Sequence, residues 1–254
     1  MREIVFPLIS LGSPAEEMPD AADVAEWISK IKGNTADIIT YNLQSSLSAQ
    51  KPHAAETCAG GIFYTPRIKD VLGFEDKVTQ DFLLDAEPIR DDLRAVKIKH
   101  SGFSLPAFSN LNLTDAYYKD SEEFFAAGAD AYKFISRELR DNGACRVVLH
   151  ADFPDDLELE VLRGKKYLWS VPDSELERVL EMSRDIVVDF KSASRLGELL
   201  DCYQIRYVYI RDADSEALKT ALNFLDKEYI FTAGYGDGSE YWKNLSGLKI
   251  KTEE

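Results

Sequence analysis

The sequence lacks the features that would place the protein in a membrane, outside the cell or around a structural metal. No apolar run approaches the roughly 18 residues that a membrane-spanning helix needs. The first segment, MREIVFPLIS, has a short apolar stretch and no small-residue cleavage site, so we expect no signal peptide. The three cysteines (Cys58, Cys145 and Cys202) are far apart and form no CxxC or Cys/His pair. This pattern predicts reduced thiols in a cytoplasmic protein.

Basic residues are scarce relative to acidic ones. The 254-residue chain has 30 Lys and Arg against 45 Asp and Glu, a net charge of −15, and no cluster of Lys or Arg. Such an acidic protein repels phosphate backbones and anionic lipids, so we expect neither nucleic acid nor a membrane as a partner. The expected partner is a small anionic metabolite held in a local basic pocket. A homo-oligomer is compatible with the sequence.

A regular alternation of apolar runs and helical patterns fills the second half of the chain. The runs cover residues 145–151, 167–171, 185–190, 206–212 and 229–234. The segments between them repeat apolar residues at spacings of three and four, as in Leu176, Val179 and Leu180. Strands about 20 residues apart with helices between them are typical of successive βα units in a parallel sheet.

The first half is less regular. It predicts strands at 3–10, 36–43 and 93–100, helices at 21–33 and 120–143, and weak strands in GGIFYTP and DFLLD. Residues 44–60 and 101–114 are rich in Ser, Asn and Pro, and we expect them to be long loops that overhang a site.

These patterns predict a single α/β domain over residues 1–254. Eight secure strands in a chain of this size favour a (β/α)8 TIM-type barrel, and the alternative is an open parallel α/β sheet. No strand is followed by GxGxxG and no GxxxxGK[ST] occurs, which excludes the nucleotide-binding versions of the open sheet.

Polar residues follow several of the predicted strands. Either architecture binds ligands at the carboxyl ends of its parallel strands. Side chains alternate between the two faces of a strand, so Asp189 and Lys191 are expected to point the same way. The residues at or near these ends are Asn42, Lys99, His100, His150, Asp189, Lys191, Arg211, Gly234 and Gly236.

The main hypothesis is an enzyme of lyase, aldolase or isomerase type that acts on a phosphorylated or carboxylated metabolite and needs no redox cofactor. Lys191 would be a Schiff-base nucleophile or an electrostatic catalyst, which requires burial or a nearby cation to lower its pKa. His150 and His100 would carry protons, with Asp189 beside Lys191. The substrate would be held by Arg211, the backbone of Gly234 and Gly236, Asn42 and Lys99.

The stretch VVDFK is loosely similar to strand ends in two groups of barrel enzymes. One group is the class I aldolases, whose Schiff-base lysine ends a strand. The other is the orotidine-monophosphate decarboxylase group, which carries Asp-x-Lys-x-x-Asp on one strand. Asp189 and Lys191 match the first two positions of that motif, but Ser194 stands where its second aspartate belongs. The likeness covers a few residues and assigns no family.

Two alternatives stay open at the level of the sequence. The first is a metal-dependent hydrolase that binds a divalent metal such as zinc through His100, His150, Asp152 and Asp189, although no HxH pair occurs. The second is a non-catalytic α/β protein that binds a metabolite or another protein, because a fold does not by itself determine a function. Each of the residues above also has a purely structural interpretation as a helix cap or a solvated corner.

Overall fold

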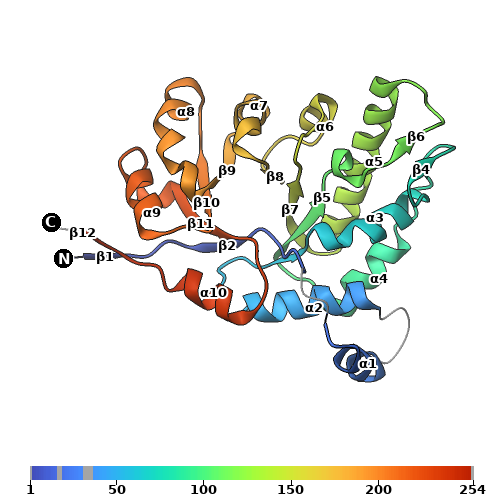
Figure 1. Cartoon of the computed structure of the whole chain (residues 1–254), viewed down its shortest axis with the longest axis horizontal. Coiled ribbons are helices and arrows are strands. Elements are labelled where there is room, and N and C mark those ends of the chain that lie inside the picture. The colour runs from blue at the N-terminus through green and yellow to red at the C-terminus, as the bar shows by residue number, and fades with distance from the viewer. Residues whose placement is uncertain (1, 16–18, 31–36, 253–254) are drawn as a thin grey trace.

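Two four-stranded parallel sheets form the centre of the molecule, and helices surround them (Figure 1). The computed structural model describes residues 2–15, 19–30 and 37–252. The first sheet has the order β2 (Leu8–Ser10), β11 (Ile230–Gly234), β10 (Tyr207–Arg211) and β9 (Asp185–Asp189). The second sheet has the order β3 (Cys58–Gly60), β5 (Ser101–Pro106), β7 (Ala144–His150) and β8 (Tyr167–Ser170). The α/β class predicted from the sequence is therefore confirmed.

Short strands pair outside the two main sheets. β1 (Arg2–Ile4) is antiparallel to β12 (Ile250–Thr252), so the two ends of the described chain lie side by side in Figure 1. β4 (Lys77–Val78) is parallel to β6 (Thr114–Asp115).

Helices follow the strands as the apolar spacing in the second half predicts. The α-helices are α1 (Ala21–Lys30), α2 (Ile38–Gln50), α3 (Thr65–Leu72), α4 (Glu87–Val96), α5 (Ser121–Asp141), α6 (Asp156–Val161), α7 (Leu176–Met182), α8 (Leu196–Cys202), α9 (Ser215–Leu222) and α10 (Ser239–Ser246). The short 3-10 helices are η1 (Ile62–Tyr64), η2 (Phe108–Leu111), η3 (Asp173–Glu175), η4 (Phe190–Arg195) and η5 (Lys227–Tyr229). Within the described ranges, no helix combines the length and the apolar character needed to cross a membrane.

The two sheets meet at two seams. At one seam a parallel bridge joins Ile9 to Glu56, and the Ser10 N–H donates to the Glu56 carbonyl at 2.9 Å. At the other seam β8 and β9 are neighbours, but no ladder joins them in the described chain. The strand ladders therefore stop short of a closed barrel. The prediction that β7 shares one sheet with β9, β10 and β11 is wrong, because β7 lies in the second sheet.

One compact apolar cluster contains residues from both sheets. Its side chains come from every second strand residue, so Val148 and Val187 face the same way as the polar residues two positions later, His150 and Asp189. Other strand residues, such as Val147, Leu149 and Ile186, pack with the helices in a second, larger cluster. The buried members of the compact cluster are Ile9, Leu11, Cys58, Val148, Leu168, Val187, Tyr209 and Ala233.

The strand predicted at 36–43 is wrong: from Ile38 this segment is helix α2, and residue 36 lies outside the described residues. The β-branched residues Ile38, Ile39 and Thr40 favour a strand, but a capping box overrides them. The Asp37 carboxylate accepts from the Thr40 N–H at 3.0 Å, and the Asp37 N–H donates to the Thr40 hydroxyl at 3.3 Å.

The strand predicted at 93–100 is also wrong. Helix α4 runs to Val96, and Lys97 ends it in the left-handed conformation with φ 52°. The strand lies further on, at β5, inside the segment 101–114 that was predicted to be a loop. Every residue of β5 is buried, although its Ser and Gly residues are typical of an exposed loop. The other predicted loop, 44–60, contains the end of α2 and β3, and the weak strand in DFLLD does not form.

Candidate functional site

Four strands end in polar side chains at the same pole of the molecule. His150, Ser170, Asp189 and Arg211 are the last residues of β7, β8, β9 and β10. His150 is in register with Ser170, and Asp189 is in register with Arg211. Each lies two positions after a residue of the compact apolar cluster, so its side chain faces the same inner space. The sequence correctly placed Asp189, Arg211 and Gly234 at one end of one parallel sheet.

His150 is the most buried ionisable group of this strand-end cluster, with 6% of its surface exposed. Its Nε2 lies 3.0 Å from the Leu11 carbonyl and 2.8 Å from the Ser104 hydroxyl. A carbonyl oxygen only accepts, so Nε2 carries the proton and Nδ1 keeps its lone pair. Burial lowers the pKa of His150 to about 4; the bond to Leu11 opposes this shift and the charge of Arg211 adds to it. His150 is therefore neutral at pH 7.

Arg211 brings a positive charge to the rim of the same space. Its Nη2 lies 3.3 Å from a carboxylate oxygen of Asp189, and its Nη1 lies 3.5 Å from the Ser170 hydroxyl. Both contacts are long for hydrogen bonds, and the Arg211 side chain is 27% exposed. Its Nε has no partner in the described part of the chain. Arg211 thus retains donors for an incoming anion.

Tyr235 covers His150 from the end of β11. The two rings lie 4.3 Å apart at an interplanar angle of 38°. The Tyr235 N–H donates to the Tyr241 hydroxyl at 2.9 Å, and Tyr241 donates in turn to Asp212. Burial raises the pKa of Asp212, although the bond from Tyr241 and the charge of Arg211 oppose this. These bonds hold Tyr235 over the imidazole.

The predicted backbone role of Gly234 and Gly236 has a packing alternative. A Cβ on Gly234 would lie 2.7 Å from the Trp242 ring, and a Cβ on Gly236 would lie 2.7 Å from the Tyr241 ring. Both glycines therefore allow α10 to approach the end of β11. Their use as substrate-binding positions stays a prediction.

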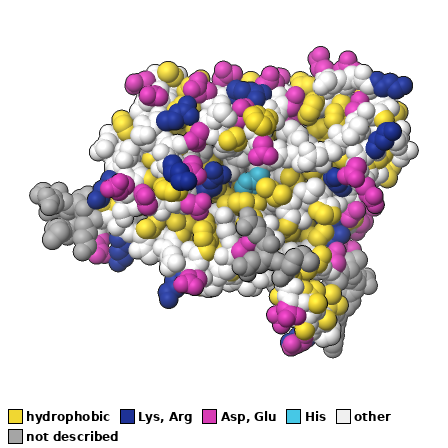
Figure 2. Space-filling view, in the orientation of Figure 1, with side chains coloured by type: hydrophobic (Ala, Val, Ile, Leu, Met, Phe, Trp, Pro, Cys, Tyr) yellow, Lys and Arg dark blue, Asp and Glu magenta, His cyan; other side chains and the backbone are white. Residues whose placement is uncertain are grey.

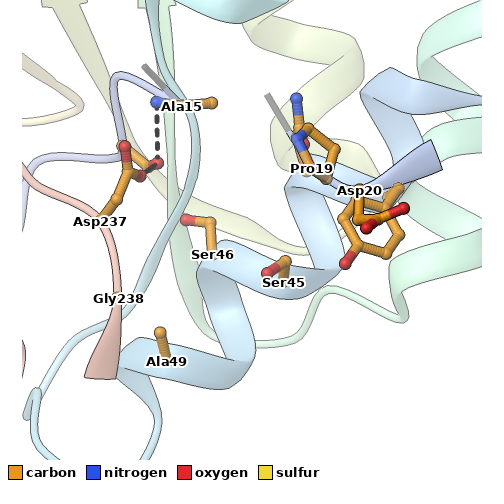
Figure 3. A pocket seen from close by; sticks show the side chains of 11 residues that line it. Ala15, Pro19, Asp20, Ser45, Ser46, Ala49, Asp237 and Gly238 are labelled. Atoms are coloured by element: carbon orange, nitrogen blue, oxygen red, sulfur yellow. Dashed lines mark hydrogen bonds between the residues drawn. The ribbon is translucent and has the colours of Figure 1, made fainter. Parts of the chain in front are cut away.

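Asn42 lines a pocket beside the strand-end cluster, although it lies on a helix rather than at a strand end. The pocket has a volume of about 350 Å³. Figure 3 shows Ala15 and Asp237 on one side, Pro19 and Asp20 on the other, and Ser45 and Ser46 of α2 between them. Its lining residues are Ser13, Ala15, Pro19, Asp20, Tyr41, Asn42, Ser45, Ser46, Ala49, Asp237 and Gly238.

Lys191 does not accompany Asp189 into the inner space. The strand ends at Asp189, whose carboxylate accepts from the Lys191 N–H at 3.1 Å and begins the turn η4. Strand alternation stops there, so the expectation that both side chains point the same way is wrong. Lys191 is exposed, and its Nζ lies 5.5 Å from the centre of the Phe190 ring. The burial that amine catalysis requires is missing.

Lys99 and His100 were predicted at the carboxyl end of a strand, but they lie at the amino end of β5. Both are exposed and precede the first residue of that strand, so they lie at its amino end. His100 adopts a left-handed backbone conformation with φ 56°, which fits a tight entry into β5. Because a parallel sheet has its amino ends at one pole, these two residues are separated from the strand-end cluster.

The metal-ligand set proposed from the sequence does not come together. His100 lies at the amino pole, and Asp152 exchanges two hydrogen bonds with Asn110, at 3.1 and 3.0 Å. In the described part of the chain, no three His, Cys, Asp or Glu side chains are grouped closely enough to hold a metal ion.

Sequence reasoning missed Ser104 and Ser170. Ser104 lies within the supposed loop 101–114, so the error in placing β5 concealed it. Ser170 ends the apolar run YLWS, and the rule that selected His150 would have selected it too. Both are buried, at 0% and 3% exposure.

No protein-family model matches this chain, and no curated protein sequence matches it.

Proposed function

We propose that the protein binds a small anionic metabolite at the carboxyl ends of β7 to β10 and acts on it as a lyase, aldolase or isomerase without a redox cofactor. The observation that carries this proposal is Arg211, a partly exposed cation with unused donors beside a buried neutral imidazole. A charge-assisted contact to a phosphate or carboxylate is strong, and Arg211 keeps donors for one beside its long contact to Asp189. The strongly acidic remainder of the protein makes the local positive site distinctive.

We also propose that the two sheets form a (β/α)8 barrel. The strands β2, β3, β5, β7, β8, β9, β10 and β11 would be neighbours in chain order around it, with the bridge at Ile9 and Glu56 at one seam. The compact apolar cluster supports this architecture, because it takes side chains from both sheets. In such barrels the carboxyl pole carries the active site, and phosphate groups commonly bind near the last two strands. These would be β10 and β11.

His150 is the proposed proton carrier. Its Nδ1 lone pair can accept a proton or hydrogen bond from a substrate, while Nε2–H holds the ring on Leu11. An anion bound to Arg211 would offset the charge that helps to lower the His150 pKa, and would bring that pKa closer to neutrality. Substrate binding would then prepare the base. Asp189 would orient Arg211.

A Schiff base on Lys191 stays a separate prediction, which its exposed position does not support. Borohydride in the presence of a true substrate would trap an adduct at Lys191 if that mechanism operates. If Lys191 carries no adduct after such treatment, the Schiff-base mechanism is refuted and the acid–base mechanism of His150 is retained.

Binding of inorganic phosphate and of malonate, measured by titration calorimetry, tests the proposal. Arg211→Met keeps much of the side-chain volume and removes the charge, so affinity should fall about 10- to 150-fold. Arg137→Met is the matched control, because Arg137 is 75% exposed on α5 and contacts Asp141. Equal affinity in both variants, or no binding of either anion to the wild-type protein, would refute the anion site.

A non-catalytic binding protein is the alternative that this test leaves, since both functions need Arg211. Once a ligand is found, its proton NMR spectrum in the presence of the protein decides between them. Conversion that disappears in His150→Gln, with phosphate affinity retained, indicates an enzyme. An unchanged ligand spectrum indicates a binding protein.

Figure 2 shows acidic side chains spread over the visible face with Lys and Arg between them. This distribution supports a metabolite rather than a nucleic acid as the partner.

A further inference from the structure

The pocket beside the strand-end cluster carries three polar side chains that make no hydrogen bond within the described part of the chain. They are Tyr41, Asn42 and Ser45, all from α2. A phenol, an amide and a hydroxyl each donate and accept hydrogen bonds. A sugar or polyol hydroxyl has the same dual character. Three such groups on one helix therefore suit a ligand that presents several hydroxyls.

The charges around the pocket exclude an anion as its occupant. No Lys, Arg or His is among the described lining residues, whereas Asp20 and Asp237 are. Both carboxylates make hydrogen bonds within the fold. Asp20 accepts from the Ala22 N–H at 2.8 Å, and Asp237 accepts from the Ser13 hydroxyl. They repel a phosphate. Each carboxylate keeps acceptor sites that an ammonium group could also use, so the test below includes an amine.

The pocket adjoins the strand-end cluster. Ser13 lines the pocket, and Leu11, two residues earlier, accepts the bond from His150. Two residues of chain span at most about 7 Å. The Tyr235 ring lies over His150, and its hydroxyl accepts from the Ile62 N–H at 3.2 Å, next to Gly61. A Cβ on Gly61 would collide with the Ser13 carbonyl, so the backbones of these loops are packed together.

We infer that this pocket binds the hydroxyl-bearing part of the substrate, so that the substrate class is a sugar or polyol carrying a phosphate or carboxylate. The anion would lie at Arg211 and the hydroxyls at Tyr41, Asn42 and Ser45. The inference rests on the proposed function for the anion and on the pocket for the hydroxyls.

The test compares ribose 5-phosphate, glycerol 3-phosphate and inorganic phosphate by titration calorimetry of the full chain. The sugar phosphate should bind at least about tenfold more tightly than inorganic phosphate, because two or more added hydrogen bonds contribute that much. The double variant Asn42→Ala and Ser45→Ala should lose this advantage and keep its affinity for inorganic phosphate. Alanine is a good helix former, so α2 should persist.

Ser48→Ala is the matched control. Ser48 is exposed on the same helix, donates to the Gln44 carbonyl at 2.8 Å and does not line the pocket. It should behave as the wild-type protein does. Equal affinity for all three phosphates would overturn the inference while leaving the anion site intact. Tighter binding of O-phosphoethanolamine than of the sugar phosphate would assign the pocket to an amine and also overturn it.

A failure of the proposed anion site can be told apart from a failure of this inference. If inorganic phosphate does not bind, neutral D-ribose still tests the pocket through the fluorescence of Trp27, whose ring lies 5.5 Å from that of Tyr41. Ribose should change this emission in the wild-type protein and in Ser48→Ala, and leave the double variant unaffected. No change in the wild-type protein would overturn the inference.

Discussion

Replacing Arg67 by methionine is expected to cost about 3–5 kcal/mol of unfolding free energy, because it leaves the Asp92 carboxylate buried without its cation. Asp92 is 1% exposed and the Arg67 side chain is 12% exposed. The guanidinium donates two hydrogen bonds to Asp92, from Nε to Oδ2 at 2.7 Å and from Nη2 to Oδ1 at 3.1 Å. It also reaches Asp37 at 2.7 Å, and thereby joins α2, α3 and α4.

The size of the effect follows from what remains around Asp92. Without Arg67, the carboxylate keeps the Tyr64 hydroxyl at 2.8 Å and a long contact to the Thr40 hydroxyl at 3.4 Å. Two neutral donors do not compensate a buried charge. Since domains are stable by about 5–15 kcal/mol, the loss is a large fraction of the total. It corresponds to a decrease in melting temperature of roughly 6–20 °C.

The free energy of unfolding that Arg67→Met loses should be larger at neutral than at acidic pH. Burial raises the pKa of Asp92 despite the opposing bonds from Arg67, and removing Arg67 raises it further. A carboxyl group with a raised folded-state pKa contributes stability below its unfolded pKa and loses that stability as the pH rises through the folded pKa. The variant should therefore be weakest near pH 7 and recover toward about pH 4.

Urea unfolding at both pH values measures these free energies. The double variant Arg67→Met and Asp92→Asn should recover at least half of the loss, because the amide is neutral and still accepts from Tyr64. Arg137→Met removes an exposed arginine and should change little. A deficit below about 1 kcal/mol, or one that is equal at both pH values, would show that Asp92 is not buried as a charge.

Other predictions concern single residues. Gly128→Ala places a Cβ 2.3 Å from the Phe108 ring in the core and should lower the melting temperature, whereas Gly197→Ala meets the exposed ring of Phe224 and should not. Burial lowers the pKa of His150 from its ordinary 6.5 to about 4, so the free energy of unfolding should fall by about 3 kcal/mol as the pH drops through that window. Urea midpoints of His150→Gln should lack this fall. Glu158→Ala removes the carboxylate that accepts from the Phe108 N–H at 2.7 Å and should lower the urea midpoint at pH 7 by the cost of the buried amides left unpaired.

The sequence was informative where burial and side-chain type agree. Strands β9 and β10 are rich in β-branched and aromatic residues and are buried, so their positions and polar ends were predictable. Strand β5 was not, because Ser101, Gly102 and Ser104 resemble a loop while their burial comes from neighbouring strands. Helix α2 was missed because a cap at Asp37 outweighed local β propensity.

The site shows the same division between local and distant causes. Strand alternation correctly grouped Asp189 with Arg211, since both face a space defined by the strands themselves. It failed for Lys191, because the carboxylate of Asp189 starts a turn one residue later. The pocket around Asn42 could not be predicted, because it depends on the approach of α2 to residues more than a hundred positions away, such as Asp237.

The seam between β8 and β9 divides the site between two separately hydrogen-bonded halves. Ser170 and His150 belong to one sheet, and Asp189 and Arg211 belong to the other. A ligand held by Arg211 and His150 would therefore act as a cross-link between the halves, stabilising them by mass action as its concentration rises above its dissociation constant. Amide hydrogen exchange at this seam should slow as ligand is added, so the resistance of the molecule to local opening would report how full its site is.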